Sequence, residues 1–262
     1  MKIVDKNIDN GKAFDWGLTS KEYAKFRDIY PEEFYKRITD RGLCLNGQKV
    51  LDLGTGTGVI PRNMYKHGAK WTGCDIAENQ IIEAKKMSEG MDIEYYALAT
   101  EDVDFPNNTF DVVTACQCFW YFKHDIVMPK LAKMLKSGGR LLVLYMAWLP
   151  FEDDIAGESE RIVLKYNPDW SGAGETRHPI FIPDCVYDYF DMVSHEEYDI
   201  KVPFTRETWH GRMKACRGVG ASLPPDKLEL WEKEHWEMLQ NFPESFDILH
   251  YAALAELKLK DR

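Results

Sequence analysis

The stretch Asp52-Leu53-Gly54-Thr55-Gly56-Thr57-Gly58 indicates the fold of this chain. It completes a short run, residues 50–53, that is typical of a buried strand, and it leads into helix-like spacing at residues 60–67. Glycines let a backbone turn tightly and approach a ligand more closely than any side chain permits. Such a loop at the carboxyl end of a first strand predicts a ligand-binding α/β fold. A glycine-rich turn that binds nothing is the alternative.

Strand-like and helix-like segments alternate after this loop. Further strands are expected at residues 70–75, 93–98, 110–116, 140–147, 195–205 and 246–257. Helices are expected at residues 78–88, 125–135, 155–166 and 226–240, and from Thr205, which can cap a helix. Strands separated by helices imply a doubly wound α/β fold. We therefore predict a mostly parallel seven-stranded sheet with helices on both faces.

Two segments depart from this simple alternation. About fifty residues separate the fifth strand from the sixth, whereas a crossover helix needs far fewer, so we expect an inserted cap at about residues 148–195. Before the first strand, Thr19 and Glu22 have the spacing of a capping box and begin helices that we expect to form a lid at residues 19–41. Residues 1–262 would then form a single domain that carries a lid and a cap.

Charge and composition limit the partners. The 262 residues carry a formal net charge of −10, and basic residues do not cluster in long runs, so DNA and RNA are not expected partners. No apolar stretch reaches the ~20 residues of a membrane span, and no secretion signal is expected after Met1. The six cysteines lack the spacing of a disulfide or zinc framework, so we expect no metal and a cytoplasmic location. A small molecule is the expected partner, and the oligomeric state stays open.

A second feature that predicts a bound nucleoside lies beyond the glycine loop. Asp75 ends the second predicted strand, at about the distance where an acid hydrogen-bonds ribose hydroxyls in nucleotide-binding folds. A carboxylate offers two oxygens to two vicinal hydroxyls. The loop and Asp75 together predict a nucleoside ligand. The alternative for Asp75 is a cap on the next helix.

Glycine spacing separates two kinds of nucleoside cofactor. A dinucleotide fingerprint that starts at Gly54 or Gly56 needs a third glycine where this chain has Val59 or Pro61. S-adenosylmethionine has no diphosphate and needs no such glycine. The Asp52 carboxylate suits a zwitterionic methionine, held through water or backbone amides, and would be a poor neighbour for a pyrophosphate. The predicted cofactor is therefore S-adenosylmethionine, with S-adenosylhomocysteine as its product.

These features resemble the class I, Rossmann-like methyltransferases of small molecules, the group that includes trans-aconitate and ubiquinone-biosynthesis methyltransferase-like enzymes. The resemblance covers residues 23–147 well. Its motifs are the Asp52–Gly58 loop, the acid Asp75, the Thr100-Glu101 pair ahead of Phe105-Pro106-Asn107-Asn108-Thr109-Phe110-Asp111, and Leu135-Lys136-Ser137-Gly138-Gly139. The resemblance implies an enzyme that transfers the methyl group of S-adenosylmethionine to a small acceptor.

The resemblance also implies roles for single residues. Thr100 and Glu101 would flank the adenine, although this chain has Ala99 where many relatives have an aspartate that accepts from the adenine amino group. Tyr23 and Arg27 would reach the cofactor carboxylate, because the planar fork of Arg pairs with carboxylates; a surface helix with routine charges is the alternative. With Asp52 included, the predicted cofactor-binding residues are Tyr23, Arg27, Asp52, Gly54, Thr55, Gly56, Asp75, Ile76, Thr100, Glu101 and Gln117.

The sequence says less about the residues that bind and activate the methyl acceptor than about those that bind the cofactor. Methyl transfer from a sulfonium rests on alignment and desolvation, and a base is needed only when the acceptor arrives protonated. No residue stands out as a base, and each of the candidates has a structural alternative. These candidates are Tyr121, His124, His178 and His210. Aromatic side chains can face a sulfonium or shape an apolar pocket, so Tyr30, Phe119 and Trp120 are expected at the acceptor. Core packing explains Phe119 and Trp120 equally well.

Basic residues gather after the fifth strand, although the chain is acidic. We hypothesise that Arg217, assisted by Arg177 or His178, holds a carboxylate-bearing acceptor; a solvated basic face is the alternative. Two other functions stay open, an S-adenosylmethionine-binding protein with non-methylating chemistry and a non-catalytic binding module. The sequence leaves the acceptor and the methylated atom undetermined.

Overall fold

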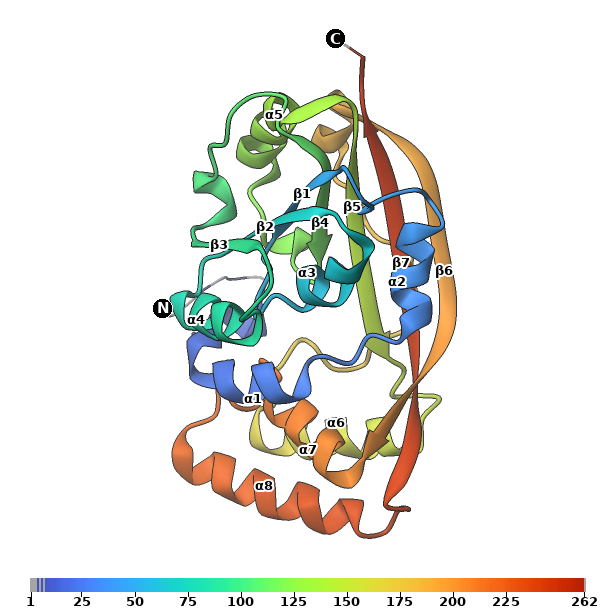
Figure 1. The fold of residues 1–262 in the computed structure, drawn as a ribbon. Coiled ribbons are helices and arrows are strands. Elements are labelled where there is room, and N and C mark those ends of the chain that lie inside the picture. The colour runs from blue at the N-terminus through green and yellow to red at the C-terminus, as the bar shows by residue number, and fades with distance from the viewer. Residues whose placement is uncertain (1–3, 5, 7, 262) are drawn as a thin grey trace. The chain divides into compact units, whose positions relative to one another are not determined.

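The computed structural model of the protein describes Val4, Lys6 and residues 8–261. The chain divides into two compact units. Figure 1 labels the helices and strands that they contain. Unit 1 comprises Met1–Ile29, Ala147–His178 and Asp199–Tyr251. Unit 2 comprises Tyr30–Met146, Pro179–Tyr198 and Ala252–Arg262. The motifs from the glycine loop to Gln117 therefore lie in unit 2, and the first predicted lid helix lies in unit 1.

Within the described residues, seven strands form one sheet. Its order is β3-β2-β1-β4-β5-β7-β6. β1 pairs in parallel with β2 and β4, and the pairs β2–β3 and β4–β5 are also parallel. The strands are β1 Lys49–Leu53, β2 Lys70–Asp75, β3 Ile93–Ala97, β4 Phe110–Cys116, β5 Leu135–Trp148, β6 Phe190–Thr205 and β7 Ser245–Leu259. The predicted α/β class with a mostly parallel seven-stranded sheet is confirmed.

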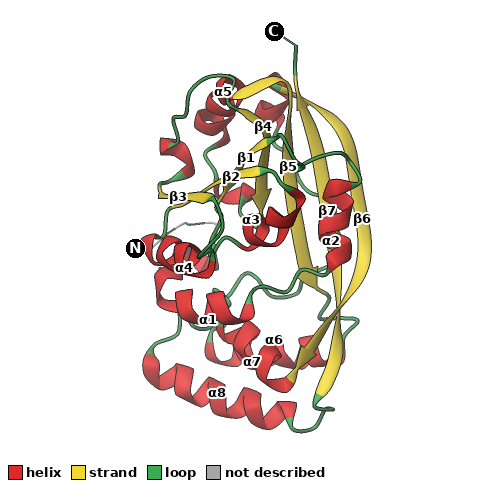
Figure 2. Ribbon diagram, viewed as in Figure 1, coloured by secondary structure: helices red, strands yellow, loops and turns green. Residues whose placement is uncertain are grey.

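The helices follow the predicted alternation. In the described part of the chain they are α1 Ser20–Phe26, α2 Glu32–Thr39, α3 Val59–Met64, α4 Glu78–Met87, α5 His124–Met134, α6 Asp154–Tyr166, α7 Arg206–Lys214 and α8 Pro225–Leu239. Figure 2 shows α2 and α3 in front of the strands of unit 2. None of the helices described between residues 8 and 261 has the length and apolar composition to cross a membrane.

The two predicted helix caps have different outcomes. The Thr205 hydroxyl accepts a hydrogen bond from the Thr208 N–H and caps α7, as expected. Thr19 makes no cap hydrogen bond, so the capping box predicted there is wrong. The backbone of Thr19, at φ −107° and ψ 9°, is not extended as capping residues usually are. The reason is that a 3-10 turn, Trp16–Thr19, runs directly into α1.

Strand β5 starts earlier than expected. It begins at Leu135, immediately after α5, rather than at Arg140. Leu135 pairs with Phe110 at the start of β4, and the register shifts before the next pair, Val112 with Arg140. Long-range pairing with β4 therefore extends the strand through glycines whose local preference is a turn.

The core of unit 2 lies between α5 and the strands. Val127, Met128 and Leu131 of α5 are fully buried and cluster with strand residues such as Leu53 and Val113. Burying one such side chain stabilises the fold by roughly 1.5–3 kcal/mol. The carboxyl ends of β1 and β4 thus rest on a rigid apolar layer, which positions the loops that follow them.

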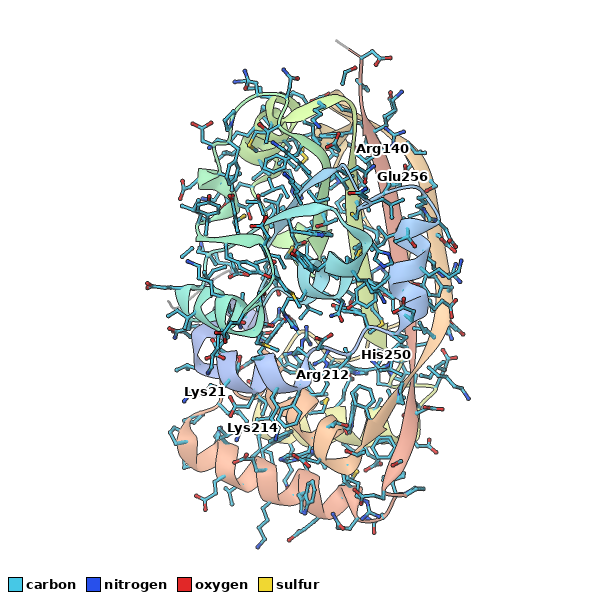
Figure 3. The ribbon with its side chains drawn as sticks, viewed as in Figure 1. Lys21, Arg140, Arg212, Lys214, His250 and Glu256 are labelled. Carbon is cyan, nitrogen blue, oxygen red and sulfur yellow. The ribbon has the colours of Figure 1, made fainter. Side chains whose placement is uncertain are left out.

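An ion pair joins β5 to β7 within unit 2. Arg140 Nε lies 3.0 Å from Oε1 of Glu256, whose side chain is buried (Figure 3). Arg41, just after α2, places its Nε 3.6 Å from the other Glu256 oxygen. Glu256 therefore ties the end of α2 and two neighbouring strands together.

Candidate cofactor site and acceptor residues

The order of the strands reverses between β1 and β4. β2 and β3 lie to one side of β1, whereas β5, β7 and β6 follow β4 on the other. In open α/β sheets, ligands bind beyond the carboxyl ends of the strands at such a reversal. The segments that leave this point are the loop after Leu53 and the segment after Cys116.

The glycine loop has a backbone that other residues rarely adopt. Gly54, Gly56 and Gly58 have φ angles of +60°, +56° and +74°. A Cβ on Gly54 would lie 2.7 Å from Cys118 Sγ, and a Cβ on Gly58 would lie 2.2 Å from the Tyr95 hydroxyl. Both the left-handed backbone and the close approach exclude larger residues at these two positions. The loop after β1 therefore packs tightly against β3 and the segment after β4.

The Asp75 carboxylate connects the glycine loop to the end of β2. Its Oδ2 accepts a hydrogen bond from the Gly56 N–H at 2.9 Å, and its Oδ1 accepts from the Ala77 N–H at 2.8 Å. Burial raises the pKa of Asp75, while these two backbone hydrogen bonds lower it. Asp75 thus holds the turn before α4 with one oxygen and lies beside the glycine loop with the other.

Asp52 lies under the loop. The residue is 1% exposed, and its Oδ1 accepts a hydrogen bond from the Thr114 hydroxyl at 2.6 Å. Burial raises the pKa of Asp52 to about 7, although the hydrogen bond from Thr114 lowers it. The carboxylate links β1 to β4 below the glycines. Asp52 therefore supports the loop from below, and its role toward a bound methionine, through water or backbone amides, stays a prediction.

Three predicted adenine contacts follow β2 and β3. Ile76, directly after β2, is 44% exposed, whereas Thr100, which begins a short 3-10 turn, is buried. Glu101 accepts a hydrogen bond from the Lys123 N–H at 3.0 Å, and its carbonyl accepts one from Lys130 Nζ at 2.6 Å. Glu101 therefore also joins the turn after β3 to the start of α5.

Gln117 bends the chain where β4 ends. Its φ of +64° is uncommon for a residue with a side chain. Its N–H donates to the Leu144 carbonyl at 2.9 Å, and its side-chain amide donates to the Met146 carbonyl. The next residue, Cys118, donates from Sγ to the Leu53 carbonyl at 3.1 Å. Gln117 is thus anchored to β5, and the residue after it packs on the glycine loop.

The aromatic run after β4 divides into two parts. Phe119 is 2% exposed and belongs to the core, which agrees with the packing alternative, and its contact with an acceptor stays a prediction. Trp120 is 48% exposed, and its ring lies edge-on to Tyr145 at 5.2 Å and beside Tyr121 at 5.8 Å. His124 begins α5 next to Phe119, and burial lowers its pKa.

Tyr30, the first residue of unit 2, lies against the end of β4. Its hydroxyl is 3.4 Å from Cys116 Sγ, and its ring stacks on Phe34 at 4.5 Å. The structure therefore brings Tyr30 to the strand end that precedes Gln117. This long-range contact agrees with a position near a ligand at the strand reversal.

Tyr23 and Arg27 form a pair in unit 1. The Arg27 guanidinium lies 4.7 Å over the Tyr23 ring, and its Nη2 donates to the Tyr23 hydroxyl at 3.3 Å. A spacing of four residues puts both side chains on one face of the helix. Their role toward a cofactor carboxylate stays a prediction.

The two arginines of the predicted acceptor clamp are engaged by carboxylates of unit 1. Nε and Nη2 of Arg177 lie 2.7 and 2.8 Å from the two Asp199 oxygens, and Nη1 bonds to Glu152. Nε of Arg217 lies 2.9 Å from Oδ2 of the buried Asp9. Bidentate pairing occupies the fork that a clamp would offer to an acceptor. These ion pairs agree with the alternative that the arginines stabilise unit 1, and a role of Arg177 or Arg217 toward an acceptor stays a prediction.

Two of the candidate bases have structural partners in the same unit. His178 Nε2 lies 2.9 Å from Glu175 Oε1. His210 Nδ1 lies 2.8 Å from His235 Nδ1, and its ring stacks on Trp231 at 5.2 Å. Burial lowers the pKa of His210 to about 4. His210 thus contributes to the packing of α7 on α8.

His250 is a buried polar residue that the sequence patterns do not single out. The residue is 1% exposed and lies on β7, between Ile248 and the apolar run Tyr251–Ala255. A single histidine inside such a run is the signal that marks it, because a buried imidazole needs polar partners.

Similarity to known proteins agrees with this geometry. Residues 51–143 match the family model described as a methyltransferase domain. A ubiquinone biosynthesis O-methyltransferase of Idiomarina loihiensis is 31% identical over 156 residues, which are 53% of this chain and 62% of that protein. The chain spans about half to three-fifths of the length of the curated relatives that it matches.

Solved structures share the fold over most of the chain. The [4+2]-cyclase SpnF superposes with a TM-score of 0.55 at 14% identity, over 93% of each chain. A structure from work on the conversion of a disulfide bond into a thioacetal group during echinomycin biosynthesis has a TM-score of 0.55 at 15% identity, over 86% of this chain and 81% of that chain. Identities this low establish the fold alone.

Residues 51–143 are therefore similar to methyltransferase domains, and the chain has the fold of the solved structures named above. Its matched region runs from β1 into β5 and contains the glycine loop, Asp75 and Gln117. Among curated proteins it is similar to ubiquinone biosynthesis O-methyltransferases.

Proposed function

We propose that this protein transfers the methyl group of S-adenosylmethionine to a small-molecule acceptor. The observation that supports this most is the position of Asp75, whose carboxylate bonds to the Gly56 N–H at 2.9 Å beside the strand reversal. A carboxylate at this position matches the vicinal hydroxyls of a ribose. The geometry supports a nucleoside ligand, and the similarity to proteins named as methyltransferases supports methyl transfer as the reaction.

The described residues fit S-adenosylmethionine. The left-handed backbone at Gly54 and Gly56 lets the main chain approach a ligand without an intervening side chain. Asp75 would accept from the ribose hydroxyls, and the half-exposed Ile76 would pack on the adenine. Gln117, anchored to β5, would contact the methionine part.

The protein's contribution to the reaction would be alignment. The bound cofactor would supply a methyl group already activated on a sulfonium, with a neutral leaving group. Holding the reactants in near-attack geometry can supply about 7–11 kcal/mol. The loop and Asp75 would hold the nucleoside, while Trp120 and Tyr145 would shield the acceptor from water beside the end of β4. An acceptor that arrives as an anion needs no base.

A second function is chemistry other than methylation on the same fold. The [4+2]-cyclase SpnF shares the fold, so the fold alone does not separate the two functions. We prefer methyl transfer because curated relatives of this region are named as methyltransferases. Incubation with labelled S-adenosylmethionine and a panel of small acids, thiols and phenols tests the choice. Transfer of label supports methylation, and cofactor binding without transfer favours the second function.

The cytoplasm is the proposed location. All six cysteines are free. Unpaired thiols persist in reducing compartments, of which the cytoplasm is the usual one.

The cofactor is tested by calorimetry with the Asp75→Asn variant. We expect S-adenosylhomocysteine to bind the wild type and NAD not to bind. The variant should weaken S-adenosylhomocysteine binding by about 1.5–3 kcal/mol, because hydrogen bonds that involve a charged group have this magnitude.

The matched control is Asp92→Asn. Asp92 is exposed and precedes β3, at the amino end of the strands and so at the opposite edge of the sheet. Its replacement should leave the affinity unchanged. Equal affinities for the wild type and the Asp75 variant would place Asp75 outside the site.

A further inference from the structure

Four residues of unit 2 form a row across neighbouring strands next to the glycine loop. Asp52 on β1 pairs in register with Thr114 on β4 and with Gly73 on β2, and Gly73 pairs with Tyr95 on β3. Side chains in register on neighbouring strands point to the same face of the sheet. Gly73 has no side chain, so the row has an open position between Asp52 and Tyr95.

The ring of Tyr95 occupies the space that Gly73 leaves. A Cβ on Gly73 would lie 2.9 Å from Cδ1 and Cε1 of Tyr95, and 2.8 Å from Oγ1 of Thr55 in the glycine loop. Glycine inside a strand is typical of a place where another group approaches the backbone closely. Tyr95 therefore lies across β2 and reaches toward the loop that follows β1.

The hydroxyl end of Tyr95 is held between the glycine loop and α4. A Cβ on Gly58 would lie 2.8 Å from Cζ of Tyr95 and closer still to its hydroxyl. That hydroxyl lies 3.0 Å from Oγ of Ser88, the residue that ends α4, and both residues are 5% exposed. Burial raises the pKa of Tyr95 to about 12, so the phenol keeps its proton at neutral pH. The hydrogen bond to Ser88 thus fixes the atom of Tyr95 that lies nearest to Gly58.

Gly58 closes the turn that presents Gly56 to the site. The Gly58 N–H donates to the Thr55 carbonyl at 2.9 Å, which is the bond between the first and fourth residues of a turn. Gly56 lies inside this turn, and its N–H donates to Oδ2 of Asp75 at 2.9 Å. A displacement of Gly58 would therefore change the direction of the Gly56 N–H and its bond to Asp75.

We propose that Tyr95 is a positioning residue for the cofactor. Its ring, held by Ser88, fixes the turn from Thr55 to Gly58 and thereby the place of Asp75 toward the ribose. A loop that already has its bound conformation loses less conformational freedom when the ligand binds, and this raises the affinity. The inference rests on the proposed binding of S-adenosylmethionine at this loop.

A double-mutant cycle tests the contact between Tyr95 and Ser88. Tyr95→Phe keeps the ring over Gly73 and removes the hydroxyl, and Ser88→Ala removes its partner. Each variant should bind S-adenosylhomocysteine about five-fold more weakly in calorimetry, the scale of one hydrogen bond. The double variant should bind no more weakly than either single variant, because all three lose the same bond. Unchanged affinity in the single variants, or losses that add in the double variant, overturns the inference.

The matched control is Tyr96→Phe. Tyr96 is the next residue of β3 and points to the opposite face of the sheet. It is 39% exposed, and its hydroxyl donates to Oε2 of Glu94 at 3.2 Å. Its replacement should leave the affinity for S-adenosylhomocysteine unchanged. A loss as large as that of Tyr95→Phe would mean that any phenol hydroxyl on β3 matters, which contradicts a specific role of Tyr95.

A spectroscopic readout separates positioning from stability. In nitrogen-15 spectra of the ligand-free protein, the Gly56 amide resonance should shift in Tyr95→Phe and Ser88→Ala and should stay in place in Tyr96→Phe. Lower stability in urea with an unchanged Gly56 resonance would make Tyr95 a purely structural residue and overturn the inference. Ser88→Ala tests the same contact if Tyr95→Phe does not fold.

Binding to the wild type separates this inference from the proposed function. A wild type that does not bind S-adenosylhomocysteine contradicts the proposed cofactor, and the positioning role is then overturned with it. A wild type that binds, together with Tyr95 and Ser88 variants of equal affinity, overturns the positioning role alone and leaves the proposed cofactor in place.

Discussion

Asp52 and Asp75 lie near the carboxyl ends of neighbouring strands, yet their surroundings give them different properties. Asp52 is 1% exposed and takes a hydroxyl hydrogen bond from Thr114, whereas Asp75 takes two backbone N–H groups. Backbone N–H groups stabilise the charged form, and burial opposes it. The residue that faces the loop is therefore Asp75, and Asp52 acts as a support with an unusual proton affinity.

The first residue-scale prediction concerns Asp52→Asn and pH. Burial raises the pKa of Asp52 to about 7 in the folded state, above its ordinary value of 3.8. The protonated form is favoured on folding, so this contribution is present below pH 3.8 and is lost as the pH rises through 7. The free energy of unfolding of the wild type, relative to the variant, should fall by about 1–3 kcal/mol between pH 5 and pH 8.

Denaturant unfolding at both pH values measures this difference. A carboxyl carbon titration by NMR gives the pKa of Asp52 directly, with a midpoint expected near 7. A difference between wild type and variant that does not change with pH would show that Asp52 is ionised throughout the range.

At the scale of elements, the clearest local device is the start of α7. Thr205 and Thr208 cap each other reciprocally: Thr205 Oγ1 accepts from the Thr208 N–H at 3.2 Å, and the Thr205 N–H donates to Thr208 Oγ1 at 2.8 Å. These bonds satisfy backbone groups that a helix leaves unpaired at its start.

Replacing Thr205 by Ala should lower the free energy of unfolding by about 1 kcal/mol, because the helix loses a cap hydrogen bond. Thr205→Ser retains the hydroxyl and serves as the matched control, with a much smaller expected loss. Urea unfolding of both variants at pH 7 measures the effect. If Ala and Ser destabilise the protein equally, the methyl group of Thr205 matters and the cap does not.

At the scale of the whole molecule, pH acts in opposite directions on two sets of buried groups. His210, His235 and His250 lie in unit 1, and burial lowers the pKa of each. Asp52 and Asp75 lie in unit 2, and burial raises the pKa of each. Protonation of these three histidines therefore opposes the folding of unit 1, whereas ionisation of these two aspartates opposes the folding of unit 2.

The low pKa of buried His210 predicts that acid destabilises the folded protein. His210 has a pKa of about 4 when folded and an ordinary value of 6.5, so its contribution is present above pH 6.5 and is lost as the pH falls toward 4. His210→Phe keeps the ring that stacks on Trp231 but does not titrate. Between pH 7.5 and pH 5, the free energy of unfolding of the wild type should fall by about 1–2 kcal/mol more than that of this variant.

Denaturant unfolding at the two pH values provides the measurement, and His178→Gln, at a half-exposed histidine, is the control. The control should lose as much stability in acid as the wild type. A His210 variant as acid-sensitive as the wild type would mean that the imidazole accepts a proton without disrupting α7 and α8.

Much of the fold could be predicted from local pattern. The strand Lys70–Asp75 and the helix Glu78–Met87 match their expected ranges to within a residue, because apolar periodicity and flanking turn residues act over short distances. Thr19 failed as a cap because the preceding turn set its backbone. The start of β5 was missed because pairing with β4, remote in sequence, overrode the local preference of its glycines.

The sequence by itself determined the alternation of strands and helices, the glycine loop and the placement of Asp75, since each depends on the spacing of neighbouring residues. Only the tertiary structure decided which polar side chains form ion pairs or hydrogen bonds within the protein. It paired Arg217 with Asp9 and Arg177 with Asp199, and it buried Asp52 under the loop. Partners far apart in the chain are brought together by packing, and no local pattern records which polar groups burial will join.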